Sequence, residues 1–348
     1  MGSLNDLFNN FHFFGFSGLF YLFLLSALFN SLQKIFLNRS STFSQSLTYH
    51  YHLDTRSYDV LGISIPNFLD VATNLIFVLV GLAGVIACAI CLPSKSSIST
   101  SEKAGWFIFF VGFSLVSLGS AYYHWTPNNW TLVWDRLPMT IGFMSLYYIA
   151  QDAYTDSDVT ISLTGNLLLG VLSMVIWFAS LFLNEQKAVR VATSRLSQTD
   201  GTDSGRVLDS HNQSEVRSPI MDSPMIKVNL MGNRDGTGMN RDDATHAISK
   251  SSVLLQDILL PYATIQFYPI VALFVMMVTW PNTAELSVWY LVPTFVLYIL
   301  AKILEAADLK SNRFYSGTCR GKISGHSLKH LSAGLAAISL IVYVVKSD

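Results

Sequence analysis

The sequence is poor in charged residues. Asp, Glu, Lys and Arg together make up 13% of its 348 residues, whereas apolar residues make up 51%. A soluble domain carries about 25% charged residues, so this composition excludes an ordinary soluble protein. The formal net charge is −1, which gives no electrostatic reason to expect nucleic-acid binding. We therefore predict an all-α polytopic membrane protein.

Cysteine is also scarce. The three cysteines cannot form a disulfide framework. Cys88 and Cys91 form a C-x-x-C pair, but they lie inside an apolar segment. A reactive thiolate needs polar surroundings, so we interpret this pair as ordinary helix residues rather than a redox site.

No basic residue precedes the first apolar segment, at about residues 11–33. A cleavable signal peptide carries positive charge there, so we expect this segment to be retained as a transmembrane helix. Seven further apolar segments are long enough to span a bilayer, at about residues 65–92, 106–125, 132–150, 162–183, 257–280, 287–308 and 324–345. The predicted domains are 1–64, an N-terminal transmembrane helix with a polar linker, and 65–345, a seven-helix core bundle.

One long stretch interrupts this bundle. Residues 184–256 are rich in Ser, Asp, Asn, Gly and Arg and contain few large apolar residues. Such a composition cannot bury enough apolar surface to offset the entropy of ordering the chain. We therefore predict a disordered loop there.

Two of the apolar segments meet through a short polar turn at 126–129. Ser120 and His124 end the first segment, and their spacing of four residues places them on one helical face. Asp135 begins the second segment and returns to about the depth of His124. Ionisable side chains at membrane depth are costly, so they need partners or a function.

A second group of histidines lies near the C-terminus. His326 and His330 are also four residues apart, and two imidazoles one helical turn apart can bind one metal ion. Counting the membrane crossings places both on the same side as Ser120, His124 and Asp135. With His124 as third ligand, the sequence predicts an open three-histidine zinc site.

The predicted site has the parts needed for hydrolysis. Zinc held by three histidines lowers the pKa of a bound water to about 7. Asp135 could take the proton of that water and pass it to a leaving amine, and Ser120 could hydrogen-bond the oxyanion or the water. Each residue alone also has a structural interpretation, since a serine near a helix end commonly bonds its own backbone. Their coincidence on three helices at one side favours a metal site that cleaves an amide or ester of a lipid.

Further polar residues lie on the same side. Asn67, Asp70 and Asn74 are spaced to share one helical face, which should point into the bundle. They either support the site residues from behind or form a hydrogen-bond cluster between helices. Three charged residues on this side are interpreted as interfacial: Glu305, Asp308 and Lys329.

The distribution of basic residues predicts the orientation. Outside the long loop, seven basic residues flank the histidine side: Lys34, Arg39, Arg56, Lys310, Arg313, Arg320 and Lys322. The opposite side has Lys95, Lys103 and Lys346. Positive charge accumulates in cytoplasmic loops, so we expect the histidine side to face the cytoplasm. We expect an endomembrane location (ER or Golgi), although the sequence does not determine the organelle.

Three strings carry a resemblance to a known family. GSAYYH at 119–124, VWDRLPM at 133–139 and GHSLKHLSAG at 325–334 resemble the motif set of the alkaline ceramidases. Their pattern is S-x-x-x-H, then an Asp shortly before Leu-Pro, then H-x-x-x-H on the last helix. The family belongs to a superfamily of seven-helix membrane hydrolases that includes the adiponectin and progestin receptors. The resemblance spans about residues 60–345, apart from the inserted loop.

The resemblance implies a specific chemistry. It implies that His124, His326 and His330 bind zinc and that Ser120 and Asp135 assist a zinc-bound water. The implied reaction releases a sphingoid base and a fatty acid from a ceramide-like lipid of the bilayer.

The resemblance leaves the calcium site and the substrate open. Family members bind calcium through an acidic cluster and a Glu, whereas here Asn67 takes the Glu position and only Asp59 lies nearby. Calcium dependence is therefore not predicted. The substrate alternatives are an acyl ester of a phospholipid or a GPI lipid, and the alternative to catalysis is a receptor-like protein that holds zinc without turnover.

Overall fold

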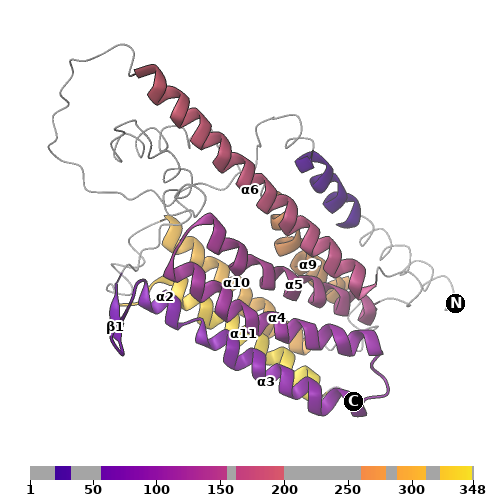
Figure 1. Ribbon diagram of the computed structural model, residues 1–348. Coiled ribbons are helices and arrows are strands. Elements are labelled where there is room, and N and C mark those ends of the chain that lie inside the picture. Colours follow the sequence, from indigo (N-terminus) through magenta and orange to yellow (C-terminus); the bar gives the residue numbers. More distant parts are fainter. Residues whose placement is uncertain are drawn as a thin grey trace.

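The computed structural model describes residues 20–32, 56–154, 162–199, 260–279, 288–310 and 322–346. Within these residues, helices occur at all eight positions predicted from the apolar segments (Figure 1). The helices are Phe20–Leu32, α2 (Phe68–Ala72) with α3 (Leu75–Cys91), α4 (Thr100–Trp125), α5 (Asn129–Tyr154), α6 (Leu163–Thr199), α9 (Leu260–Thr279), α10 (Val288–Lys310) and α11 (Gly325–Lys346).

Five of these helical stretches are long and apolar enough to cross a membrane: Phe68–Ser94, Thr100–Trp125, Leu163–Ser180, Trp289–Asp308 and Gly325–Lys346. Two shorter apolar helices, Phe20–Leu32 and Leu260–Val275, accompany them. The prediction of an all-α polytopic membrane protein is confirmed.

Six helices form a closed ring. Each helix contacts the next in the order α3, α4, α5, α9, α10 and α11, and α11 packs back against α3. Helix α6 packs outside this ring, against α5 and α9, and its far end extends beyond the bundle (Figure 1). This arrangement encloses the space in which a site for a lipid could form.

The additional N-terminal helix, Phe20–Leu32, packs on the outside of the ring. The Phe20 side chain is fully buried, and its ring centroid lies 4.6 Å from those of both Tyr147 and Tyr268. The Tyr21 hydroxyl lies 3.0 Å from Gln151 Oε1 and 3.0 Å from Asn166 Oδ1. This helix therefore attaches to α5, α6 and α9 through both aromatic and polar contacts.

The corner between α4 and α5 is closely packed. A methyl group at Gly119 would collide with the backbone carbonyl of Trp134, so only glycine allows the two helices to approach here. At the start of α5, Asn128 and Thr131 cap each other: Thr131 N donates to Asn128 Oδ1 at 2.9 Å, and Asn128 N donates to Thr131 Oγ1 at 3.2 Å. These contacts place Ser120 and Asp135 across from each other.

Exposed tryptophans surround this corner. Trp125, Trp130 and Trp134 each expose between 39% and 47% of their surface. Tryptophans of this kind gather at the boundary between the bilayer and water. The corner therefore lies near one face of the membrane.

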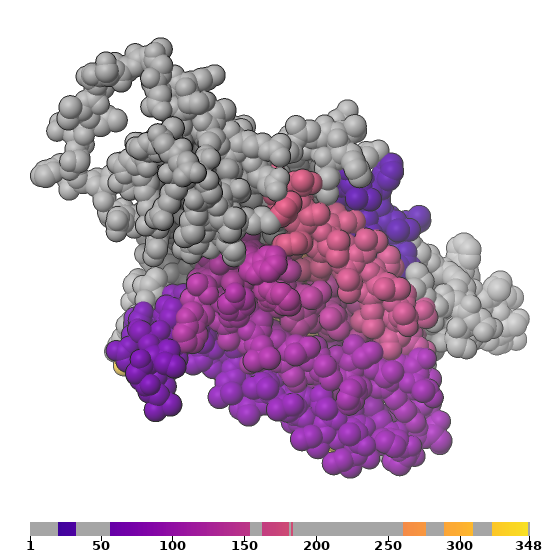
Figure 2. Space-filling view, viewed as in Figure 1, coloured from indigo at the N-terminus to yellow at the C-terminus, as the bar shows by residue number. Residues whose placement is uncertain are grey.

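The structure differs from the sequence interpretation at three places. The first core segment is not one helix, because a break at 73–74 separates α2 from α3. An antiparallel hairpin, β1 (Tyr58–Val60) and β2 (Ile63–Ile65), lies within the predicted polar linker and projects from one end of the bundle (Figure 2). Helix α6 continues to Thr199, past the predicted end at 183, because the polar residues that follow include good helix formers such as Glu185 and Ala188.

Two predicted segments fall largely outside the described residues. These are most of the linker before residue 56 and the part of the predicted loop from 200 to 256. The disordered character of that loop stays a prediction.

Candidate metal and active site

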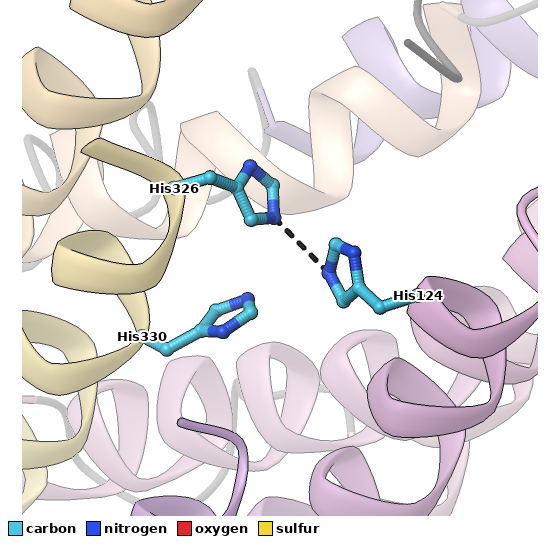
Figure 3. Close-up of side chains that lie close together, drawn as sticks. All are labelled: His124, His326 and His330. Carbon is cyan, nitrogen blue, oxygen red and sulfur yellow. Dashed lines mark hydrogen bonds between the residues drawn. The ribbon is translucent and has the colours of Figure 1, made fainter. Parts of the chain in front are cut away.

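Three histidines from two distant helices meet at one end of the ring. His124 comes from the last turn of α4, and His326 and His330 come from the first turns of α11 (Figure 3). One ring nitrogen from each lies within 4.8 Å of the others, and the Nε2 atoms of His124 and His326 are 3.1 Å apart. The rings point toward a common centre, as Figure 3 shows. These are the three residues that the sequence predicted as metal ligands.

The hydrogen bonding of His330 fits metal binding. The Thr73 hydroxyl donates its only hydrogen to the Leu69 carbonyl at 2.7 Å and lies 2.9 Å from His330 Nδ1. Because that hydrogen is already used, the hydroxyl accepts from the ring, and the proton of His330 resides on Nδ1. Nε2 is then the unprotonated ring nitrogen, and this is the form of imidazole that binds a metal. Three converging neutral imidazoles suit a zinc ion.

Thr73→Val is therefore expected to lower zinc affinity by about 10- to 100-fold, as loss of a residue that orients a ligand commonly does. Valine has nearly the same shape but cannot accept the proton of His330. Chelator competition would measure the dissociation constant. Thr73→Ser, which keeps the hydroxyl, is the matched control. An unchanged zinc affinity in Thr73→Val would contradict the orienting role.

Two carboxylates hold the N-terminus of α11, which carries His326 and His330. Asp308 Oδ2 accepts the backbone N–H of His326 at 2.6 Å. Asp70 Oδ1 accepts from the hydroxyls of Ser324 at 2.8 Å and Ser327 at 2.6 Å. Both interactions fix where the helix begins and hence where its histidines point.

The predicted polar stripe faces the bundle and has mixed roles. Asn67 Nδ2 donates to the backbone carbonyl of His124 at 2.7 Å, so it supports a site residue directly. Asp70 links α2 to the N-terminus of α11 as described. Asn74 Nδ2 donates to the Asp70 carbonyl of the preceding helix at 2.7 Å. Asn67 therefore supports a site residue, whereas Asp70 and Asn74 belong to a hydrogen-bond cluster between helices.

Ser120 and Asp135 lie together at the α4–α5 contact. Both side chains are buried, and the Ser120 hydroxyl hydrogen-bonds the Asp135 carboxylate. Asp135 also lines the cavity inside the ring. The structure thus brings the predicted serine and aspartate into contact at the end of the ring where His124 lies.

An apolar cavity extends from this end into the ring. Helices α3, α4, α5, α9, α10 and α11 all contribute to its walls, which include Phe77, Phe109, Phe113, Met139, Phe143 and Leu340. Its polar lining includes Asp135, Lys302, Glu305 and Lys329. A cavity of this kind accepts an amphiphile whose polar part lies near the charged residues.

Residues 60–227 match the ceramidase family model. This match confirms the resemblance to the alkaline ceramidases over the matched residues. The match includes Ser120, His124 and Asp135, whereas His326 and His330 lie beyond it. No curated protein and no solved structure matches the chain. The convergence of the α11 histidines on His124 is therefore an observation independent of the family match.

Next to Asp135, the ceramidase-family segment holds a buried arginine. The Arg136 guanidinium carbon lies 4.5 Å from the ring centroids of both Trp177 and Tyr262. Cation–π contacts of this kind join α5 to α6 and α9. Tyr262 also lines the cavity, so Arg136 helps to shape its wall.

Three residues near the site have roles that the sequence interpretation missed. Thr73 lies three residues from Asp70, on the polar stripe itself, so helical spacing could have included it. Glu305 and Lys329 were interpreted as interfacial, but their side chains are only 16% and 21% exposed and both line the cavity. These two residues form an ion pair that faces the cavity, a role that the interfacial interpretation did not include.

Proposed function

We propose that the protein is a zinc-dependent intramembrane hydrolase. It cleaves the N-acyl amide bond of ceramide-type sphingolipids to a sphingoid base and a fatty acid. The observation that carries this proposal is the convergence of His124, His326 and His330 in a chain whose residues 60–227 match the ceramidase family. The histidine group adjoins an apolar cavity through Lys329, which lines the cavity and contacts His326.

The three histidines would hold the zinc ion. When bound, zinc supplies hydroxide at near-neutral pH by lowering the pKa of a water molecule to about 7. Asp135 accepts the proton of the attacking water and returns it to the leaving amine, since it lines the cavity at this end. Ser120 donates its single hydroxyl hydrogen to the ionised Asp135 carboxylate, and it can turn that hydrogen to the developing oxyanion once Asp135 has taken the proton.

The cavity supports a lipid substrate. Its walls are mainly apolar and aromatic, and its charged residues lie at the end near Asp135. Acyl chains would occupy the apolar part, which places the scissile bond beside the histidines. Within the described residues, the histidine group is the one set of three or more His, Cys, Asp or Glu side chains that could hold a metal ion, so we propose zinc alone.

Hydrolysis by the purified protein tests the proposal. We expect release of sphingoid base and fatty acid from a long-chain ceramide, detected by mass spectrometry, with lysophospholipid and GPI lipid cleaved much more slowly. Preferred cleavage of either ester would replace the amide assignment. Zinc binding without hydrolysis of any of these lipids would favour the receptor-like alternative.

The location and orientation of the protein stay predictions. We propose an endomembrane location with the histidine side toward the cytoplasm. Asn129, in the sequon Asn-Trp-Thr at 129–131, lies on that side. N-glycosylation of Asn129 in cells would contradict the orientation.

A further inference from the structure

A cluster of three charged side chains lines the polar end of the cavity. Glu305 Oε2 accepts from Lys302 Nζ at 3.0 Å, and Glu305 Oε1 accepts from Lys329 Nζ at 3.1 Å. We name Lys302, Glu305 and Lys329 the lysine–glutamate cluster. Two of its members come from α10 and one from α11, so it bridges neighbouring helices of the ring.

The lysine–glutamate cluster touches the metal site. Lys329 Nζ lies 3.1 Å from His326 Nε2, in addition to its bond with Glu305. Because Lys329 also lines the cavity, its ammonium group connects the histidine group to the cavity. A group released from the histidines into the cavity would therefore lie close to Lys329.

The charges at this end favour binding of one anion. The cluster has two ammonium groups and one carboxylate, a net charge of +1, and Asp135 in the same cavity contributes −1. A divalent cation held by the histidines would add +2. The lining residues and the cation then sum to +2, and adding Arg136, Asp70 and Asp308, which flank the site, leaves +1. A net positive charge is costly in mainly apolar surroundings unless an anion offsets it.

The cavity favours a carboxylate on an acyl chain over other anions. Phe109, Phe113 and Phe143 line the same space as the cluster, so the ligand must combine an apolar chain with its charge. A carboxylate has a single negative charge and two oxygens that two ammonium groups can share. A phosphomonoester carries a charge of about −1.5 to −2 and is bulkier than a carboxylate. It therefore fits less well between two lysines that already share Glu305.

We propose that Lys302 and Lys329, held by Glu305, form a subsite that binds the carboxylate of a long-chain fatty acid. This inference rests on the proposed function, because that acid is the product released by amide hydrolysis. The subsite receives the carboxylate as the carbonyl carbon leaves the histidines, and the acyl chain stays in the apolar part of the cavity.

Equilibrium binding of a fatty acid tests the subsite without any turnover. The purified, zinc-loaded protein is titrated with a long-chain fatty acid, the fatty alcohol of the same length and the matching alkyl phosphate. We expect the acid to bind at least about tenfold more tightly than the alcohol, as expected for hydrogen bonds to charged groups. The double variant Lys302→Met/Lys329→Met should reduce this preference to about twofold or less, since methionine keeps the apolar length of lysine but has no charge.

Lys103→Met is the matched control. It removes one positive charge from the start of α4, which lies about 30 Å along the helix from His124. We expect it to keep the full preference for the acid. If the double variant does not fold, Glu305→Gln serves instead, because it raises the net charge of the cluster by one and should tighten acid binding severalfold while leaving alcohol binding unchanged.

Several results would overturn the subsite. These are equal binding of acid and alcohol by the wild type, a preference for acid that survives in the folded double variant, tighter binding of the alkyl phosphate, or no tightening in Glu305→Gln. The two proposals fail separately. Ceramide hydrolysis without a lysine-dependent preference for the acid rejects only the subsite, whereas lysine-dependent acid binding without hydrolysis rejects only the proposed reaction.

Discussion

Replacing His124, His326 or His330 by alanine is expected to remove zinc and abolish hydrolysis. Each variant leaves two imidazoles, fewer than the three protein ligands that a catalytic zinc site uses. We expect zinc affinity to fall by more than about 100-fold, the upper end of the effect of residues that only orient a ligand. Elemental analysis gives the zinc content per protein, and ceramide hydrolysis is measured on the same sample.

A histidine outside this group provides the control for these variants. His211, in the predicted loop, can be replaced by alanine in the same way, and we expect His211→Ala to retain full zinc content and activity. Full zinc occupancy in His330→Ala would contradict its assignment as a ligand. Loss of zinc in His211→Ala would show that the loop takes part in the site.

Asp135→Asn is expected to slow hydrolysis by about 10²- to 10⁴-fold, the usual contribution of a general acid–base residue. Asparagine keeps the shape of the side chain but cannot accept the proton of the attacking water. Zinc content should be unchanged, because Asp135 is not among the converging ligands. Turnover under saturating ceramide and elemental analysis, taken together, separate the loss of the base from the loss of the metal.

Asp152→Asn is the matched control for this variant. Asp152 lies on the same helix, about 25 Å farther along, where it accepts hydrogen bonds from Ser99 and Tyr148. We expect near-normal hydrolysis in that variant. Normal turnover in Asp135→Asn would rule out the proposed proton transfer, and a parallel loss of zinc would make Asp135 a structural support of the metal site instead.

Much of the fold follows from the order of apolar segments. Eight segments predicted eight helical positions, because long apolar runs in a membrane protein have few alternatives to a helix. The end of α6 was not predictable from hydropathy, since a helix can leave the membrane and continue through polar residues to Thr199. The break at 73–74 was also missed, because Thr73 and Asn74 interrupt an otherwise apolar pattern too briefly to indicate a kink.

The site was predictable to the extent that it depends on spacing and crossing number. The i, i+4 pairs and the count of membrane crossings brought Ser120, His124, Asp135, His326 and His330 to one end, and the structure places them there. Contacts made across the bundle were not predictable. Thr73 bonds to its own helix at Leu69, as a threonine in a helix commonly does, and only tertiary structure adds His330 as a second partner.

The sequence also could not distinguish a lysine at the interface from one inside the cavity. Lys329 lies one residue from His330, so its helical position is compatible with either location. Its direction is decided by Glu305 on α10, which lies 24 residues earlier in the chain. A charge partner on another helix is not visible in local spacing.

The closed ring has a consequence for biosynthesis. Helix α11 contacts both α3 and α10, and it is made after the other five ring helices. During translation, the growing chain contains His124, Ser120 and Asp135 while the gap between α3 and α10 is still open. The three imidazoles meet only when α11 enters that gap. Under the proposed function, an incomplete polypeptide would therefore lack the metal site needed to cleave the lipids of the membrane into which it is being inserted.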